Sequence, residues 1–130
     1  MHYIPLGDRE NWLAGQILDI AIKIHKAVGP GLLESIYEKC FIQDLESRKI
    51  PFESQKRLDI IYDDVLMEAG LRLDILIDDK IIVEIKAQDE YHRVWEAQLL
   101  SYLKLSGKRL GYILNFHSPL MKQGVRRLIL

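Results

Sequence analysis

Cysteine is nearly absent from this sequence, since Cys40 is the only one among 130 residues. A single thiol excludes an intramolecular disulfide and a zinc centre built from several cysteines. Such cysteine usage is typical of a reducing compartment, so we expect a cytoplasmic protein. The first residues also lack the basic segment followed by an apolar core that marks a secretory signal.

Several familiar functional patterns are missing as well. No apolar run approaches the length of a membrane span, so no membrane partner is expected. The sequence has no glycine-rich phosphate loop, no nucleophile elbow and no zinc-type spacing of histidine and cysteine. These absences direct attention to chemistry based on carboxylates.

The chain has no large excess of charge of either sign, because 18 basic residues nearly balance 19 acidic ones, for a formal net charge of -1. The distribution is nevertheless uneven: residues 59–90 contain ten acidic and three basic residues, whereas residues 97–130 contain six basic and no acidic ones. An acidic region that collects metal, beside a basic face, would suit a phosphodiester substrate. Two unrelated solvated surfaces would give the same pattern.

Length and composition predict one globular domain over residues 1–130, with 48% hydrophobic and 28% charged residues. Apolar residues recur at spacings of three and four in three segments, which predicts amphipathic helices at residues 11–28, about 33–49 and about 91–105. Alternating patterns predict strands at residues 52–62, 109–116 and, at a sheet edge, 125–130.

The segment at residues 71–87 is the most informative part of the sequence. Two short alternating runs flank a polar turn, which predicts a β-hairpin. A loop of three residues makes Asp74 face Glu84, with Cβ atoms roughly 5 Å apart. The same register makes Arg72 face Lys86. A loop of two residues would instead place the two carboxylates on opposite faces of the sheet.

Two facing carboxylates repel each other, and burying them without a partner is costly. A divalent cation removes that cost, and Mg²⁺ and Mn²⁺ prefer oxygen ligands of this kind. Lys86 on the same face could hold an attacking water or an anionic substrate oxygen. Alternatively, Lys86 and Arg72 could neutralise the carboxylates as a buried ion network that needs no metal.

Other candidates lie on the predicted helices. Glu34 and Tyr37 share a face, where Glu34 could simply complement the helix N-terminus and Tyr37 could pack half-buried with its hydroxyl at the rim. Gln98 and Tyr102 also share a face, as the polar flank of a core helix would. His25 lies in the last turn of the first helix, where we expect a structural role against the helix dipole.

Asp74, nine intervening residues and then Glu84-Ile85-Lys86 resemble the signature of the PD-(D/E)XK nuclease superfamily, the fold of many restriction endonucleases. From about Leu13 onward the chain also resembles the group named GxxExxY proteins, through Gly31, Glu34 and Tyr37. Further matching pieces are Ile24-His25-Lys26, Val28-Gly29-Pro30, Val83-Glu84-Ile85-Lys86-Ala87 and Glu96-Ala97-Gln98-Leu99-Leu100-Ser101-Tyr102-Leu103. Leu71 stands where the superfamily name has proline, a loss that the superfamily tolerates.

This resemblance implies an α/β fold with a restriction-endonuclease-like αβββαβ core, in which helices flank a mixed central sheet, and with an extra N-terminal helix. It implies Mg²⁺- or Mn²⁺-dependent hydrolysis of phosphodiester bonds in nucleic acid, DNA more than RNA. Gln98 and Tyr102 would line the substrate groove. The alternative is a catalytically silent nuclease-fold module that binds nucleic acid or a protein partner.

The resemblance also assigns roles to individual residues. Asp74 and Glu84 would ligate the metal, with the carbonyl of Ile85 as a further ligand. Lys86 would stabilise developing charge or orient the water. Glu34 would join the site from the first core helix, through water or metal.

Contacts to phosphates should come from the basic C-terminal third, with candidates Lys108, Arg109, Arg126 and Arg127, and should weaken steeply with salt. So small a domain leaves little surface for reading bases. We therefore expect structure-directed or nonspecific cleavage, or specificity supplied by a homodimer or a protein partner.

Overall fold

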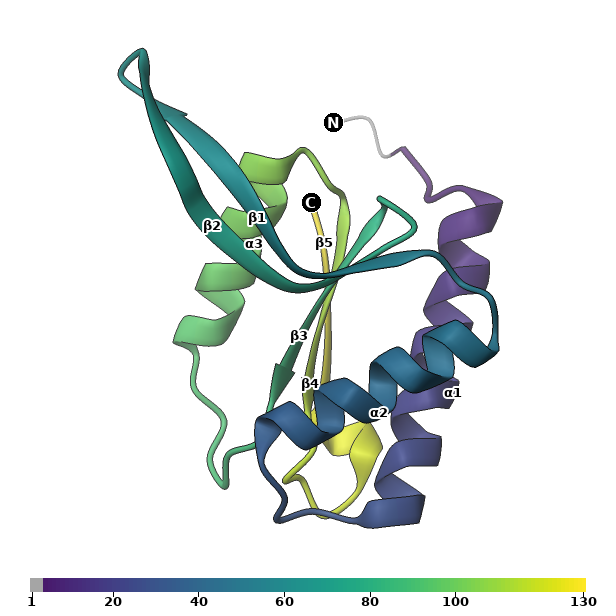
Figure 1. Cartoon of the computed structure of the whole chain (residues 1–130). Coiled ribbons are helices and arrows are strands. Elements are labelled where there is room, and N and C mark those ends of the chain that lie inside the picture. Colours follow the sequence, from purple (N-terminus) through teal and green to yellow (C-terminus); the bar gives the residue numbers. More distant parts are fainter. Residues whose placement is uncertain (1–3) are drawn as a thin grey trace.

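The computed structural model describes residues 4–130 of the chain. Its elements are, in order, α1 (Asp8–Val28), α2 (Glu34–Ser47), β1 (Phe52–Tyr62), β2 (Val65–Ile77), β3 (Ile81–Lys86), α3 (Val94–Ser106), β4 (Leu110–Asn115), the 3₁₀ helix η1 (Met121–Gly124) and β5 (Val125–Ile129) (Figure 1). After α1, the order of helix, three strands, helix and strand confirms the predicted core. Between residues 4 and 130, no helix is both long enough and apolar enough to span a membrane.

The strands form one mixed sheet in the order β1-β2-β3-β4-β5. Only β3 and β4 are parallel neighbours in it, whereas the other neighbouring pairs are antiparallel. Two parallel strands need a crossover connection, and α3 provides it. The result is the mixed sheet flanked by helices that the sequence predicted, with β5 at an edge.

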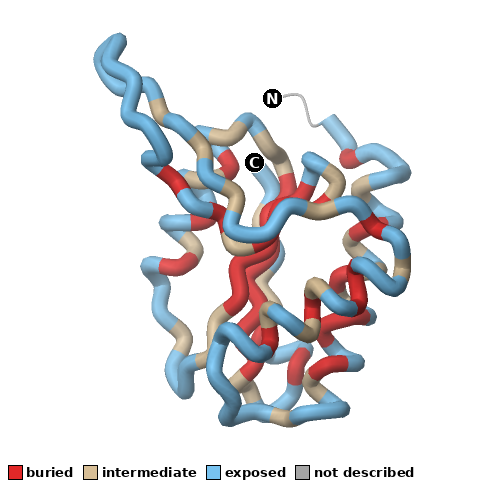
Figure 2. Tube along the Cα trace, viewed as in Figure 1, coloured by how far each residue is buried: buried red, intermediate tan, exposed pale blue. Residues whose placement is uncertain are grey.

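Helices cover both faces of the sheet (Figure 1). The helices α1 and α2 pack on one face, where Ile75, Val83 and Tyr112 belong to the same core cluster. On the other face, α3 packs Leu99 against Ile82 in a second cluster. Because successive side chains of a strand point to opposite faces of the sheet, apolar residues on both faces form two separate cores. Figure 2 shows the buried residues gathered along the central strands.

The β1–β2 hairpin is longer than the sequence predicted. β2 begins at Val65, so the hairpin continues beyond the sheet as a projecting ribbon (Figure 1). Gly70 lies inside β2 and does not mark the start of a strand. Glycine is needed there because a Cβ would lie 2.2 Å from Cγ1 of Ile60 on the neighbouring strand. The pairing of the two strands shifts between Leu58 and Ile60. This irregularity separates the projecting part from the sheet.

Glycine also sets the distance between α3 and β4. A Cβ at Gly111 would lie 2.8 Å from Cδ1 of Leu99, and Leu99 is fully buried, so its side chain has no room to move away. Gly111 therefore allows α3 to approach the sheet closely.

We expect Gly111→Ala to lower the free energy of unfolding by about 1–3 kcal/mol, because the added methyl group overpacks the contact between α3 and β4. Gly15→Ala in α1 is the matched control, since a Cβ there meets nothing within 4 Å. That change should instead raise stability by about 0.5–1 kcal/mol through better helix propensity. Urea denaturation measures both, and a Gly111→Ala variant as stable as wild type would contradict the prediction.

Candidate active site

The site lies where β2 and β3 separate. Their residue pairs run from Ile77 and Ile81, next to the turn, to Ile75 and Val83, where the pairing ends. The turn between them consists of residues 78–80, which confirms the loop of three residues. The register therefore continues to the two acidic residues that the sequence singled out.

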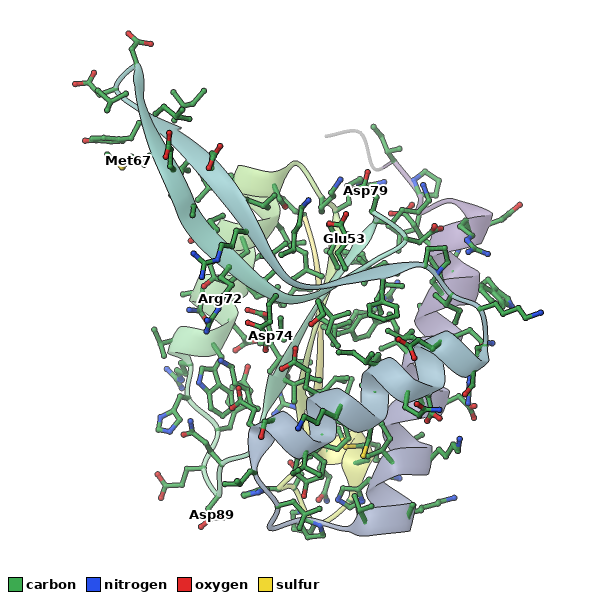
Figure 3. All side chains as sticks on the ribbon, viewed as in Figure 1. Glu53, Met67, Arg72, Asp74, Asp79 and Asp89 are labelled. Atoms are coloured by element: carbon green, nitrogen blue, oxygen red, sulfur yellow. The ribbon has the colours of Figure 1, made fainter. Side chains whose placement is uncertain are left out.

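Asp74 and Glu84 face each other just beyond the last backbone pair. The N–H of Asp74 donates to Oε2 of Glu84 at 2.8 Å, and the N–H of Ile85 donates to Oδ2 of Asp74 at 2.9 Å. The two carboxylates thus join β2 and β3 where the main-chain pairing of the strands ends. In Figure 3, Asp74 lies near the middle of the molecule, at the base of the long hairpin.

Burial and mutual repulsion control the charge of this pair. Glu84 is only 5% exposed, and burial, followed by the nearby Asp74 carboxylate, raises its pKa to about 8. Burial likewise raises the pKa of Asp74. Two such groups do not both ionise readily at neutral pH unless positive charge is brought to them.

Helix α2 directs two more carboxylates toward this pair. Burial, followed by the Asp74 charge, raises the pKa of Glu34, although much of Glu34 is exposed. Burial also raises the pKa of Glu38, one helical turn later, and the Asp74 charge adds to the rise. Within residues 4–130, no three acidic, histidine or cysteine side chains lie close enough to share a metal. Glu34 is therefore near enough for the Asp74 charge to affect its pKa, but it forms no three-residue metal cluster with the pair.

Gln55 on β1 belongs to the site, although no sequence pattern indicated it. Its Nε2 donates to Oε1 of Glu38 at 2.8 Å. Burial raises the pKa of Asp74, and Gln55 is one of the neighbouring groups that oppose the rise. Gln55 has a φ of 52°, a left-handed conformation that is uncommon for a residue with a side chain and often marks functional sites.

Lys86, the last residue of β3, has its ammonium 5.5 Å from the ring centre of Trp95 on α3, an attractive cation–π arrangement. Trp95 was expected only as a core residue. In the part of the chain that the structure describes, the ion pairs lie elsewhere, and neither Lys86 nor Arg72 pairs with the two carboxylates. The arrangement thus differs from the closed ion network that the sequence left open.

Of the predicted groove residues on α3, the structure brings Tyr102 to the carboxylates. Burial raises the pKa of Tyr102, and the charges of Glu84 and Asp74 add to the rise. Gln98, one turn earlier, is exposed, and its side chain makes no hydrogen bond among the described residues. Tyr102 is therefore part of the candidate site, whereas Gln98 faces solvent beside it.

Tyr37 is completely buried, so the prediction of a half-buried ring with its hydroxyl at the rim was wrong. Its hydroxyl donates to the carbonyl of Gly29 at 2.6 Å and accepts from the N–H of Leu32 at 3.1 Å. Both partners belong to the turn that leads into α2. Tyr37 therefore fixes where α2 begins, and with it the position of Glu34.

Two histidines support the same region. Nε2 of His25, in the last turn of α1, lies 2.8 Å from the carbonyl oxygen of Ser118, a contact that ties α1 to the turn after β4. Nε2 of His117 lies 2.8 Å from the carbonyl oxygen of Leu32. These contacts are consistent with the structural role expected for His25.

The predicted phosphate-binding residues have different surroundings. Lys108 forms an ion pair with an aspartate of the β2–β3 turn at 3.0 Å, and Arg109 donates to main-chain carbonyls. The guanidinium of Arg126 lies over the ring of Tyr91 at 4.6 Å, and Arg127 is exposed. Arg126 also donates to the main-chain carbonyls of Gln123 and Val125, both at 3.1 Å. Lys108, Arg109 and Arg126 thus have structural partners, which leaves the exposed Arg127 as the better candidate for contact with a ligand.

A comparison with protein families matches residues 11–128 to a family model described as the PD-(D/E)XK nuclease superfamily. The chain belongs to the PD-(D/E)XK nuclease superfamily. Members of this superfamily are generally metal-dependent nucleases. No curated protein and no solved structure matches the chain.

A divalent cation, typical of PD-(D/E)XK nucleases, fits the residues at this site. The N–H of Asp74 donates to Oε2 of Glu84, and the N–H of Ile85 donates to Oδ2 of Asp74. The second oxygen of each carboxylate, Oε1 of Glu84 and Oδ1 of Asp74, thus remains for a ligand. Mg²⁺ is commonly held by one or two carboxylates together with water molecules. The raised pKa of Glu84 reflects the electrostatic cost that a cation would remove.

Neutralising position 84 should change the pH dependence of stability. The pKa of Glu84 rises from 4.5 to about 8 on folding, so the folded state keeps a proton that the unfolded state releases, and wild type loses stability as the pH rises through this range. Glu84→Gln retains an oxygen that can accept from Asp74 but carries no charge. In metal-free protein at pH 8, we expect the variant to be more stable than wild type by about 2 kcal/mol or more. Below pH 4.5 the two should converge.

Chemical denaturation in EDTA at several pH values tests this prediction, and parallel curves for the two proteins would contradict it. Added Mn²⁺ should stabilise wild type at pH 8 and leave Glu84→Gln almost unchanged. Asp64→Asn, at the exposed tip of the long hairpin, is the control for loss of one carboxylate and should respond to Mn²⁺ as wild type does.

Removal of the Tyr37 hydroxyl should destabilise the turn before α2. Tyr37→Phe leaves the carbonyl of Gly29 and the N–H of Leu32 without their partner, which should lower the free energy of unfolding by about 1–3 kcal/mol. Tyr62→Phe is the control, because Tyr62 is 70% exposed and should change stability by less than about 0.5 kcal/mol. Urea denaturation compares them, and equal effects would mean that the buried hydroxyl does not fix the turn.

Proposed function

We propose that this chain is a nuclease that uses Mg²⁺ or Mn²⁺ to hydrolyse phosphodiester bonds in nucleic acid, with DNA preferred to RNA. The observation that carries the proposal is the pair of hydrogen bonds that sets the Asp74 and Glu84 carboxylates side by side. Glu84 lies two residues before Lys86 on the same strand. A cation, a nucleophilic water and a phosphate oxygen are the ligands that this combination suits.

When bound, a divalent cation lowers the pKa of a water molecule and polarises the scissile phosphate. In this proposal Asp74 and Glu84 hold the cation, and the carbonyl of Ile85 is a candidate for a third protein oxygen. The ammonium of Lys86 offsets the negative charge that builds on the phosphate oxygens in the transition state. Trp95 holds that ammonium at the edge of the site through the cation–π contact.

The surrounding residues then take supporting roles. Glu34 holds a water molecule from the start of α2, and Gln55 holds Glu38 near the pair through its hydrogen bond. The raised pKa of Tyr102, which follows from burial, keeps its hydroxyl protonated, so that it can donate to a phosphate oxygen. Gln98, exposed on the same helical face, contacts the substrate beyond the metal.

The alternative, a catalytically silent binding module, accounts less well for the buried carboxylates. A binding module gains nothing from two acidic groups whose burial raises the pKa of both. The near-neutral net charge of -1 argues that nucleic acid is held by local contacts, for which the exposed Arg127 is available. Cleavage should accordingly depend on substrate shape more than on sequence.

Two finer assignments belong to the same proposal. The spacing of Gly31, Glu34 and Tyr37, together with the role of Tyr37 in fixing the turn before α2, supports membership of the GxxExxY group. A reducing compartment such as the cytoplasm is proposed because Cys40 is the only cysteine of the chain.

Cleavage assays with end-labelled single-stranded, duplex and branched DNA and with RNA test the proposal. We expect cleavage that requires Mg²⁺ or Mn²⁺ and that falls roughly a hundredfold or more in Asp74→Ala and Lys86→Ala, in line with the loss of groups that stabilise transition-state charge. Lys80→Ala is the matched control, because Lys80 is an exposed lysine in the turn of the same hairpin. Its activity should equal that of wild type.

The variants also separate catalysis from binding. An inert wild type that still binds nucleic acid, with Asp74→Ala binding equally well, would support the binding module and overturn the nuclease. Equal cleavage by wild type and both site variants would indicate activity from a contaminant or another site.

A further inference from the structure

The projecting part of the β1–β2 hairpin, residues 59–68, is called the arm here. It extends away from the rest of the molecule, and the trace in Figure 2 is exposed along almost its whole length. Apolar side chains nevertheless dominate its tip, where Ile61 is 72% and Tyr62 is 70% exposed. Their neighbours on the second strand, Val65, Leu66 and Met67, are exposed as well.

Both faces of the arm are apolar. Ile61 pairs with Leu66, and Tyr62 pairs with Val65, so the two pairs lie on opposite faces of the ribbon. A two-stranded ribbon has no further layer to cover either face and is only marginally stable in water. Exposed apolar surface of this kind marks a site of interaction.

The charge of the arm narrows the choice of partner. Residues 59–68 contain four acidic residues and no basic one, namely Asp59, Asp63, Asp64 and Glu68. Nucleic acid would be repelled by this charge, and so would a second arm placed beside the first. The complementary surface is therefore an apolar groove with positive charge at its rim.

This protein carries such a groove on its own α3 and C-terminal segment. A hollow of about 220 Å³ is lined by Leu100, Ser101, Lys104 and Leu130. Two exposed apolar residues, Leu105 and Ile129, lie in the same two segments, which provides a wider apolar surface for a ribbon. Lys104, among the residues that line the hollow, carries a charge opposite to that of the acidic arm.

The arm and the groove also start from the same part of the fold. Leu58, at the base of the arm, packs against the core cluster that contains Leu103 of α3, and Leu128 of β5 packs on it too. Because both surfaces are rooted in one cluster and the arm leads away from it, a twofold axis can bring each arm to the groove of the other copy. Such an exchange would cover the apolar face of each arm that enters the groove.

We propose that this protein forms a symmetric dimer in which the arm of each copy docks into the α3 groove of the other. The contact is between an apolar ribbon with acidic flanks and an apolar hollow bordered by Lys104. This inference concerns assembly, and it does not depend on the proposed nuclease activity.

Sedimentation equilibrium of the full chain at several concentrations and moderate salt tests the proposal. We expect wild type to be a dimer, and Leu66→Asp on the arm or Leu100→Asp in the groove to be monomers. Leu120→Asp is the control, because Leu120 is also an exposed leucine but lies outside both surfaces. That variant should remain a dimer. Circular dichroism and urea denaturation establish that each variant is folded.

Charge reversal tests the pairing of the two surfaces. Lys104→Glu should weaken dimerisation at least tenfold, and adding Asp63→Lys and Asp64→Lys to the same chain should restore it. A mixture of the Leu66→Asp and Leu100→Asp chains should form a heterodimer, since one intact arm then meets one intact groove.

Three results would overturn the proposal. The first is a wild type that stays monomeric at the highest concentrations reached. The second is a dimer that survives both leucine variants. The third is a dimer that needs the arm but tolerates Leu100→Asp and Lys104→Glu, which would mean that the arm binds another surface.

Discussion

The candidate site depends on two hydrogen bonds that cross between β2 and β3 through carboxylates instead of carbonyls. At this point the strands separate, and the N–H groups of Asp74 and Ile85 would otherwise lose their acceptors. A buried N–H without a partner costs about 1–3 kcal/mol, so the two acidic side chains contribute to the fold, whatever their role in the proposed chemistry. This contribution helps to explain why repelling groups are kept side by side inside the protein.

Unfavourable features are concentrated around this point. Gln55 has a left-handed backbone within a strand, and the pKa of Glu84 is raised by burial next to Asp74. Each feature reduces the stability of the metal-free protein, and domains are stable by only about 5–15 kcal/mol. The remainder of the sheet, with apolar cores on both faces, provides the stability that tolerates them. Any cation that the site binds would therefore also stabilise the folded state.

Much of this organisation could be predicted because it is local in sequence. The alternation of residues 71–87 predicted the hairpin, and a loop of three residues placed Asp74 opposite Glu84, but the sequence left a loop of two residues open and only the structure decided between them. Glu38 could also have been found, because it lies one helical turn after Glu34. Sequence reasoning could not place Gln55, whose role depends on an unusual φ, and it underestimated the burial of Tyr37, because the turn it holds folds back from the preceding helix. It also left open whether Lys86 pairs with the carboxylates, since Trp95 approaches it only through tertiary packing.

The shift of pairing between Leu58 and Ile60 has a consequence for how this molecule can change over evolutionary time. Residues at the base of the hairpin keep one register with each other, and residues toward its tip keep another. An insertion or deletion beyond the shift alters the length and chemistry of the ribbon without displacing Gln55 or Asp74. Changes in the exposed ribbon and changes around the two carboxylates can therefore accumulate on one continuous strand with little mutual interference.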